Sequence, residues 1–492
     1  MGPDEVTEKL RGDYIYDSIF NTSTISDSEI NSLPDNIDDY GPGYALISSI
    51  ILNIFKIDSL RNIFLFRHFL SFFIYFIGLI FFYLLSNKFF KNNFLSFLSL
   101  IFLILSPRIF GEAFTNTKDT IFMSFFIISA YTLFEFYEKK TLKYLFFHSL
   151  STALLVDTRI LGLIMIFLTL LLFIFDFFKF EKNKFKIFFK KNELKLLFIY
   201  LILSSILIIL FWPKLWSNPL YLFTALKNMA NHDMIVNENY FGESILSNNL
   251  PWHYTIVWIF ISTPLIYSFL FLIGIFILFK SKEIFKNKNL IIFLWFFIPL
   301  FMIIVLKSTI YDTWRHLFFI YPAFILITVY GFNWLNNFFK NKKYKKFVSF
   351  FYVAILIGLI LTLVFIIKNH PYQNVYFNPL IRATFDLKEN FELDNMGMSI
   401  RQGLEYIVNN DKRDNLNVSF VGISPIPNLY ILNEEDSKRI NLVHLPDYVG
   451  DYSNLNYFLT NFRWWSKNVF DCNKVYSIDV EGTEILMVCK LN

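Results

Sequence analysis

The sequence predicts a polytopic α-helical membrane protein of about ten transmembrane helices, with an α/β domain at its C-terminal end. Of its 492 residues, 55% are hydrophobic and only 17% are charged, so a water-soluble globule of this length would lack the polar residues to cover its surface. Most of ten apolar stretches come close to the roughly 20 residues that a helix needs to cross a bilayer, and three of them are shorter. After Lys368 the composition changes abruptly to that of an ordinary soluble domain.

The apolar stretches and the basic residues between them predict the topology. Lysine and arginine gather in every second connection, and such connections face the cytoplasm. This alternation places residues 1–64, the loop 214–255 and residues 369–492 on the extracytoplasmic side, around a membrane domain of residues 65–368. The heavy use of Phe, Ile, Lys and Asn is typical of an AT-rich genome, so we expect a bacterial plasma (inner) membrane. The ten predicted spans are residues 65–85, 94–107, 118–137, 143–157, 159–178, 195–213, 256–279, 289–307, 313–333 and 346–367.

The first 64 residues are predicted to form an extracytoplasmic loop. Within it, residues 44–55 are apolar but too short to span, so we expect an amphipathic helix that lies on the outer membrane surface. A polar segment of this length is normally carried across the membrane by a preceding helix. We therefore expect a transmembrane helix upstream of Met1.

The C-terminal segment shows the mixed pattern of an α/β domain. Residues 400–408 predict a helix, and a terminal hairpin is predicted to turn at Glu481 and Gly482. Counting across that hairpin brings Cys472 near Cys489, which leaves a disulfide open. The predicted strands are residues 418–421, 440–443, 457–461, 475–480 and 485–490.

Charge and cysteine content exclude several classes of function. The formal charge of +5 comes from lysines in short blocks between apolar runs, which are topology signals, and we expect no nucleic-acid partner. Two cysteines are too few for a thiolate metal cage, and His232 with Asp233 lack an obvious third ligand. We predict no tightly bound metal, while a requirement for a divalent cation such as Mg²⁺ or Mn²⁺ in catalysis is left open.

Ionisable residues gather at the outer ends of the predicted helices. Charges near a membrane are costly, so a one-sided cluster is a candidate site. Transfer from a lipid phosphate needs a carboxylate base for the acceptor hydroxyl and cations for the departing phosphate, and both kinds of group are present. A flippase or transporter would place polar residues or broken helices near the bilayer midplane. The cluster includes Asp4, Glu5, Arg67, His68, Arg108, Glu112, Lys118, Asp119, Asp157, Arg159, Asp312, Arg315 and His316.

Short motifs at these positions resemble those of the GT-C glycosyltransferases. The likeness is to bacterial relatives of the protein O-mannosyltransferases and aminoarabinose transferases, of the glycosyltransferase family 39 type, and it spans nearly all of the membrane region. The order of the motifs relative to the helices is more specific than any one of them. They are Asp38-Asp39-Tyr40-Gly41-Pro42-Gly43-Tyr44, Arg67-His68, Leu105-Ser106-Pro107-Arg108-Ile109-Phe110, Asn116-Thr117-Lys118-Asp119, Asp157-Thr158-Arg159-Ile160-Leu161-Gly162, Phe211-Trp212-Pro213-Lys214-Leu215-Trp216-Ser217-Asn218-Pro219, Pro251-Trp252-His253-Tyr254, Ser262-Thr263-Pro264, Tyr311-Asp312-Thr313-Trp314-Arg315-His316 and His370-Pro371-Tyr372-Gln373.

The resemblance implies an inverting transferase that moves a hexose or pentose from a polyprenyl-phosphate donor to a lipid, glycan or protein acceptor outside the membrane. It assigns Asp4 and Glu5 to the family's acidic pair, whose leading aspartate is the base, and Asp119 to a second acidic position. From the residues themselves, the donor phosphate has five candidate partners. They are Arg315, Lys118, Arg108, Arg67 and His316.

Each of these residues also has a structural interpretation. Asp4 and Glu5 are equally explained as a polar terminus, and Asp119 as a carboxylate that complements a helix dipole. Arg315 lies beside aromatic residues, as a residue that anchors a helix at the membrane interface does. Asp157 and Arg159 are predicted to form an ion pair in a tight turn. Two other classes of function stay open, a lipid or polysaccharide flippase and a non-catalytic scaffold.

Overall fold

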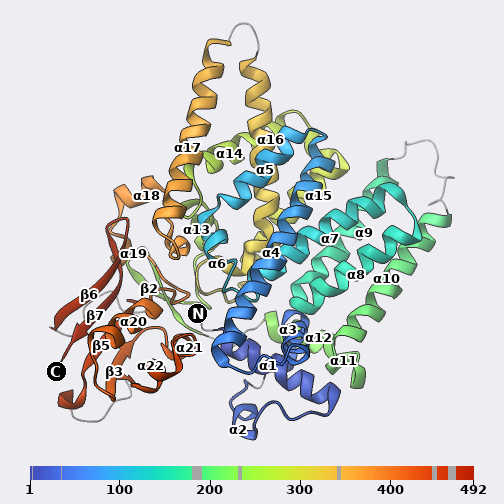
Figure 1. The fold of residues 1–492 in the computed structure, drawn as a ribbon. Helices are drawn as coiled ribbons and strands as arrows, with labels where there is room; N and C mark the ends of the chain where they lie inside the picture. The colour runs from blue at the N-terminus through green and yellow to red at the C-terminus, as the bar shows by residue number, and fades with distance from the viewer. Residues whose placement is uncertain are drawn as a thin grey trace.

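The protein is mostly helical, and its helices form a membrane bundle (Figure 1). The computed structural model describes residues 1–2, 4–34, 36–179, 191–230, 235–340, 345–445, 452–463 and 472–491. Within these residues six helices are long and apolar enough to cross a bilayer, so the chain is a multi-pass membrane protein. They are Leu60–Phe90, Asp119–Lys139, Glu193–Phe211, Asn287–Leu306, Arg315–Phe339 and Val348–Lys368.

All ten predicted apolar stretches are helical, but the stretch 256–279 is broken in two. Pro264 separates α13 from α14, because proline has no N–H to continue the helix. Several of the remaining helices fall short of a bilayer thickness, so the count of ten spans stays a prediction. The helices of this region are α4 (Leu60–Phe90), α5 (Asn93–Ile104), α6 (Pro107–Glu112), α7 (Asp119–Lys139), α8 (Leu142–Thr158), α9 (Leu163–Lys179), α10 (Lys191–Phe211), α13 (Tyr254–Ile261), α14 (Leu265–Lys280), α15 (Asn287–Leu306), α16 (Tyr321–Phe339) and α17 (Val348–Lys368).

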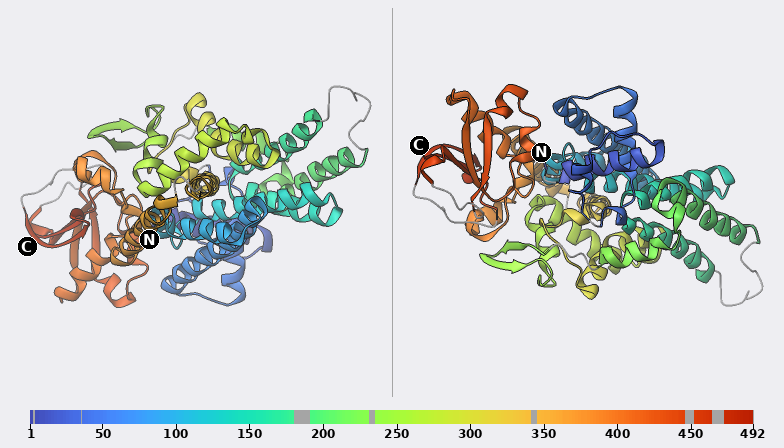
Figure 2. Two further views of the ribbon diagram at one scale, coloured as in Figure 1. Left: turned by 90° about the horizontal axis from the view of Figure 1, so that it is seen from above. Right: turned by 90° about the horizontal axis from the view of Figure 1, so that it is seen from below.

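Helix α16 lies at the centre of the bundle, as the views along the helices show (Figure 2). It packs closely on α14 through two glycines. A Cβ on Gly331 would lie 2.1 Å from the carbonyl oxygen of Leu270, and a Cβ on Gly274 would lie 2.2 Å from that of Ile327. The two backbones therefore approach to a distance that a larger residue would prevent.

The N-terminal region differs from the predicted loop. Residues 4–20 form α1 (Asp4–Phe20), whose polar residues include the buried Glu5, Glu8 and Arg11. Hydropathy does not reveal this helix because its buried face is charged and is stabilised by ion pairs rather than by apolar contacts. Short helices α2 (Asp27–Ile30) and η1 (Ile37–Asp39) follow, and then α3 (Gly43–Ile54), the predicted surface helix, which packs on α1.

The predicted outer loop 214–255 is attached to this N-terminal region. Lys214 Nζ lies 2.6 Å from Asp38 Oδ2, and the Tyr221 hydroxyl donates to Asp39 Oδ1 at 2.6 Å. The acidic pair Asp38 and Asp39 of the motif before Tyr40 therefore links two loops. His232 and Asp233 lie outside the described residues. The elements of this loop are α11 (Lys214–Ser217), α12 (Tyr221–Ala230), and the strands β1 (Asn237–Tyr240) and β2 (Glu243–Leu246).

The segment after α17 contains a five-stranded mixed sheet, drawn in the orange and red part of Figure 1. The strand order is β4-β3-β5-β7-β6, with β3 parallel to β4 and β5, and the last two strands forming the predicted antiparallel hairpin. Helix α20 (Ile400–Asn410) packs on this sheet. The strands are β3 (Leu416–Val421), β4 (Ile440–His444), β5 (Tyr457–Thr460), β6 (Asn473–Val480) and β7 (Thr483–Lys490), and the short helices are η6 (Gln373–Val375), α18 (Pro379–Thr384), α19 (Leu387–Asn390), α21 (Ile426–Leu429), α22 (Glu434–Lys438) and η8 (Tyr452–Asn454).

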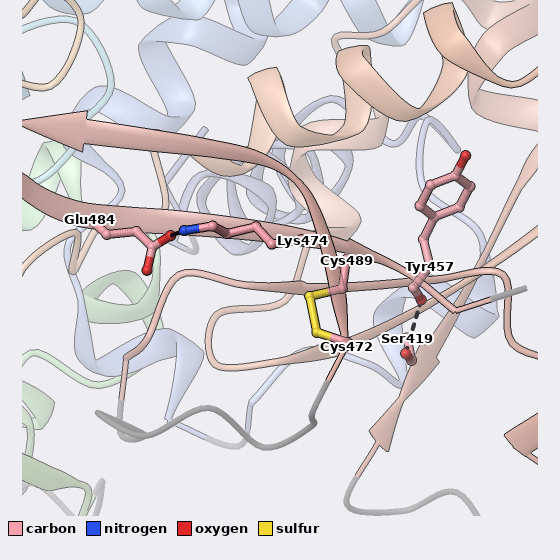
Figure 3. The surroundings of a disulfide bond; sticks show 6 residues. All are labelled: Ser419, Tyr457, Cys472, Lys474, Glu484 and Cys489. Atoms are coloured by element: carbon pink, nitrogen blue, oxygen red, sulfur yellow. Dashed lines mark hydrogen bonds and ion pairs between the residues drawn. A yellow bond between two sulfur atoms is a disulfide. The ribbon is translucent and has the colours of Figure 1, made fainter.

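A disulfide joins Cys472 to Cys489 beside this hairpin, as the sequence left open (Figure 3). A second connection ties the segment to the membrane helices. Asn378 donates its backbone N–H to the carbonyl oxygen of Ile261 at 2.9 Å and its side-chain N–H to that of Phe260 at 3.0 Å. These two carbonyls end α13, where Pro264 interrupts the helix, so the backbone and side chain of one residue from beyond α17 satisfy them.

Candidate active site

Three of the predicted site residues meet at one guanidinium group. Arg315 Nη1 lies 2.8 Å from Asp4 Oδ2 and 3.3 Å from Asp119 Oδ2. The other terminal nitrogen, Nη2, lies 2.9 Å from Asp312 Oδ2. Arg315 and Asp119 are buried, whereas the side chain of Asp4 keeps 34% of its surface exposed. Asp4 is therefore the member of this cluster that is open to a substrate.

Asp119 does not cap its helix. It is the first residue of α7, and Asn116, two residues before the N-cap position Lys118, accepts through its Oδ1 from the backbone N–H of Asp119 at 2.7 Å and from that of Lys118 at 3.2 Å. The Asn116 amide also donates to Asp119 Oδ2 at 3.0 Å. The carboxylate of Asp119 is thus held toward Arg315, and its place in the first turn of α7 also lets its charge complement the helix dipole, as the sequence allowed.

An unusual backbone turn presents Arg315. Asp312 and Thr313 have φ angles of +59° and +70°, a region that residues with side chains seldom adopt. The turn is held by side chains on both sides, since Arg108 Nη1 donates to Thr313 Oγ1 at 3.3 Å and Trp314 Nε1 donates to Ser262 Oγ at 2.8 Å. It brings Asp312 back to Arg315, which begins the 3-10 turn η4 (Arg315–Ile320).

The charges around Asp4 keep it ionised. Burial alone would raise the pKa of Asp4, but the positive charges of Arg315 and Lys118 outweigh it and hold the pKa below the ordinary value. Lys118 Nζ also lies 2.9 Å from Glu8 Oε1, one helical turn after Asp4, and 4.6 Å from the centre of the Tyr40 ring. Lys118 therefore joins the cluster through α1.

The described contacts of Glu5 and Arg67 are with residues other than Asp4, Asp119 and Arg315. Glu5 Oε2 lies 2.6 Å from His68 Nε2, and its other oxygen accepts from the backbone N–H of Gly2 at 2.7 Å. The guanidinium of Arg67 donates to Ser48 and lies 5.1 Å from the centre of the Tyr44 ring. The described contacts therefore give both residues a role in attaching α1 and α3 to α4.

Arg108 lies on the other side of the Asp312 turn, and part of its guanidinium is unpaired within the described residues. Its side chain is buried against Trp258, with the guanidinium carbon 5.4 Å from the ring centre, and within the described residues its Nε and Nη2 have no hydrogen-bond acceptor. Neighbouring Glu112 accepts from Asn116 at 2.8 Å. Burial raises the pKa of Glu112 to about 7, against the charge of Arg108. Buried donors without acceptors are consistent with a site for an anion.

The predicted ion pair between Asp157 and Arg159 is wrong. Arg159 Nη2 contacts Asp119 Oδ1 instead, and Asp157 Oδ2 accepts from the backbone N–H of Gly43 at 3.0 Å. The two residues are neighbours in sequence, but the chain turns between them at the end of α8. Their side chains therefore contact different elements, Asp157 the start of α3 and Arg159 the start of α7. Arg159 is thus a site residue that sequence reasoning assigned elsewhere.

His316 is adjacent to the cluster, with its ring 4.7 Å from the ring of Tyr311, centre to centre. Glu8 and Asn116 are further members that sequence reasoning missed. The signal for Glu8 was its spacing of four residues from Asp4 on one helical face.

A divalent cation does not fit the cluster as these residues stand. Two carboxylates from α1 and α7 converge, but the guanidinium of Arg315 lies at the point where they meet. Within the described residues there is also no group of three or more His, Cys, Asp or Glu side chains arranged to hold a metal ion. The positive charge between the carboxylates is therefore supplied by arginine.

Solved structures show which fold this is. The oligosaccharyltransferase of Archaeoglobus fulgidus in its apo form aligns with 94% of this chain at 11% identity and a TM-score of 0.52, and the chain spans 66% of the length of that enzyme. ArnT from Cupriavidus metallidurans, bound to undecaprenyl phosphate, aligns with 99% of this chain and 94% of its own length at 10% identity and a TM-score of 0.49. No family model and no curated protein sequence matches the chain. The protein has the fold of the GT-C glycosyltransferases, which confirms the resemblance that the motifs indicated.

Proposed function

We propose that the protein is a membrane glycosyltransferase that moves a hexose or pentose from a polyprenyl-phosphate donor to a lipid, glycan or protein acceptor on the extracytoplasmic side of a bacterial plasma membrane. The observation that carries this proposal is the convergence of Asp4 and Asp119 on Arg315, because it unites a base and a phosphate-binding group where α1 meets the ends of two membrane helices. The shared GT-C fold supports the same class of reaction.

In the proposed reaction the acceptor hydroxyl attacks the anomeric carbon from the face opposite the phosphate. The bond between that carbon and the phosphate oxygen breaks, and polyprenyl phosphate leaves with the bonding electron pair. Asp4 takes the hydroxyl proton, and Arg315 with Arg108 stabilises the charge on the departing phosphate. Attack from the opposite face inverts the anomeric configuration. Asp119 holds Arg315 through the contact described above.

Donor binding activates Asp4 in this mechanism. A carboxylate whose pKa is held down by Arg315 is a weak base. When the phosphate of a bound donor neutralises part of the charge of Arg315, that charge stabilises the Asp4 carboxylate less, and the pKa of Asp4 rises toward the ordinary value. Asp119 and Asp312 keep the guanidinium within the site during this step. The base therefore gains strength when the donor is in place.

A cavity offers room for the lipid part of the donor. It has a volume of about 490 Å³ and lies between α4, α7 and α8, with Phe81, Phe125 and Leu154 among its lining residues. Phe125 is six residues after Asp119 on α7, which corresponds to roughly 9 Å along the helix. We assign this cavity to the isoprenoid chain. A Leu154→Trp substitution should fill it and raise the KM for the donor while kcat stays within about twofold, and an unchanged KM would argue against the assignment.

The test is transfer by the purified protein in lipid nanodiscs. Release of polyprenyl phosphate would be measured from a panel of hexose and pentose donors, with bacterial membrane extract as the acceptor. Asp4→Asn should reduce kcat by about 10²-fold or more, since general base catalysis contributes about that much. Asp17→Asn is the matched control, because Asp17 lies on the same helix but its described contacts are all with its local loop, where it accepts from Thr22, Thr24 and Ile25.

Two results would overturn the proposal. One is full turnover by Asp4→Asn. The other is an absence of transfer from every donor combined with movement of a labelled lipid across the bilayer, which would identify a flippase.

A further inference from the structure

A second buried charge cluster joins three distant parts of the chain next to the candidate site. Glu238 comes from β1 in the outer loop, Asp312 from the turn before η4, and Glu392 and Arg463 from the segment after the last membrane helix. All four side chains are at least 95% buried, with relative exposures of 0%, 3%, 2% and 5%. Such groups are costly to bury unless they are paired.

Arg463 makes the central contacts of this cluster. Its Nη2 pairs with Asp312 Oδ1 and lies 3.9 Å from Glu238 Oε1, while its Nη1 donates to the carbonyl oxygen of Asn395 at 2.7 Å. Burial raises the pKa of Glu238 and of Glu392, and the charge of Arg463 works against that rise in both. Arg463 is therefore the cation that lowers the pKa of both carboxylates.

Asp312 connects this cluster to the candidate active site. One oxygen pairs with Arg463, and the other lies 2.9 Å from Arg315 Nη2. Its backbone is held as well, since its N–H donates to Glu238 Oε1 at 3.0 Å and Glu238 Oε2 accepts from the Tyr254 hydroxyl at 2.9 Å. Asp312 is thus a bridge between two guanidinium groups, one on each side of the turn.

The direction of the Arg315 side chain depends on this bridge. The two contacts of Nη1, to Asp4 and Asp119, lie on one side of the guanidinium, and the contact of Nη2 with Asp312 fixes the other. A planar group held at both terminal nitrogens has a set orientation, whereas one held at a single nitrogen can rotate. Because Arg463 holds Asp312 in turn, a residue from the C-terminal segment controls where Arg315 points.

We infer that Arg463 is a positioning residue for the transfer reaction, which orients Arg315 through Asp312 and makes turnover depend on docking of the C-terminal segment against the membrane helices. This inference rests on the proposed function of the Asp4, Asp119 and Arg315 cluster. It assigns no contact between Arg463 and the donor or the acceptor. Loss of Arg463 should therefore slow the chemical step rather than weaken binding of either substrate.

The experiment compares Arg463→Ala and Arg463→Lys with Arg439→Ala in nanodiscs. Arg439 is a matched control because it also stabilises the C-terminal segment, by donating to the carbonyl oxygen of Val408 at 3.1 Å and pairing with Asp436 at 3.2 Å, but none of its described contacts reaches the cluster. Arg463→Ala should lower kcat by about 10- to 100-fold, as expected for a misplaced contact group, with the donor KM within twofold. Arg463→Lys should restore part of the rate.

Two further measurements separate positioning from a general loss of structure. In an Asp312→Asn background, Arg463→Ala should lower kcat by less than twofold more, because both residues act through the same bridge. Amide hydrogen exchange in residues 311–316 should become faster in Arg463→Ala and stay unchanged in Arg439→Ala. If Arg463→Ala does not fold, kcat and the hydrogen exchange of residues 311–316 are compared between Arg439→Ala and the milder variants Arg463→Lys and Asp312→Asn.

Equal kcat in wild type and Arg463→Ala would overturn the inference, and so would equal losses in Arg463→Ala and Arg439→Ala. Either result would leave the proposed function intact, since that depends on Asp4 and Arg315. If the wild type transfers no sugar from any donor, the proposed function fails separately. The hydrogen exchange of residues 311–316 then decides whether Arg463 positions the turn.

Discussion

Replacement of Arg315 by lysine tests the site most directly, because it keeps the charge and removes the geometry. Nη1 of the guanidinium lies 2.8 Å from Asp4 and 3.3 Å from Asp119, and Nη2 lies 2.9 Å from Asp312. A lysine ammonium is a single nitrogen and cannot serve both sides. Loss of one charge-assisted hydrogen bond costs about 1.5–3 kcal/mol, which corresponds to a fall in kcat of roughly 10- to 150-fold when the contact positions the phosphate group.

The assay for Arg315→Lys is the single-turnover rate of polyprenyl phosphate release at saturating donor. Arg382→Lys is the control, because its guanidinium also pairs with a carboxylate, Glu481 at 2.7 Å, but at the sheet rather than at the site. The control should keep a rate within twofold of the wild type. The reasoning would be refuted by an Arg315→Lys rate within twofold of the wild type, or by a control that loses as much.

Three other properties follow from the structure. Burial raises the pKa of Glu392 to about 8, above the ordinary 4.5, so the folded protein holds this proton more tightly than the unfolded chain and loses stability as the pH rises from about 4.5 to 8. The apparent Tm of Glu392→Gln minus that of the wild type should therefore increase as the pH rises over this range. A difference that stays constant with pH would count against the raised pKa of Glu392. Because arginine supplies the charge between Asp4 and Asp119, transfer should continue at an unchanged rate in EDTA, and a rate restored only by added Mn²⁺ or Mg²⁺ would contradict this. Gly331→Ala should destabilise the bundle by about 1–3 kcal/mol through the clash with the Leu270 carbonyl, which would be measured as a lower apparent Tm in detergent. Gly358→Ala is the control and should lower the Tm less, because its Cβ would meet the Ile266 side chain at 3.0 Å rather than a backbone carbonyl.

The membrane helices and the strands after Lys368 were predictable because each is specified by local pattern. A bilayer requires long apolar helices, and the predicted spans are helical in the structure, with one break in the stretch 256–279 at Pro264. The hairpin of β6 and β7 turns at Glu481 and Gly482 as predicted, since turn chemistry and alternation lie close together in the sequence. Helix α1 was missed because its buried face is polar, so the usual apolar periodicity is absent.

Part of the candidate site could be predicted from the sequence, but the partners of its residues could not. The sequence placed charges at the outer helix ends, and the structure brings Asp4, Asp119 and Arg315 into contact. Which cation faces which carboxylate depends on packing between elements far apart in the chain. For this reason Arg159 was paired with its neighbour Asp157 rather than with Asp119, and Arg463 was not considered at all.

The contact of Asn378 with the end of α13 has a consequence for biogenesis. The carbonyl groups of Phe260 and Ile261 are released early in synthesis, when the break at Pro264 leaves the ribosome, but their partner follows more than a hundred residues later. Until Asn378 has been synthesised and has folded back, these two acceptors depend on water. Maturation of the bundle is therefore coupled to completion of the whole polypeptide, and chains that stall after α17 leave that helix end unsealed.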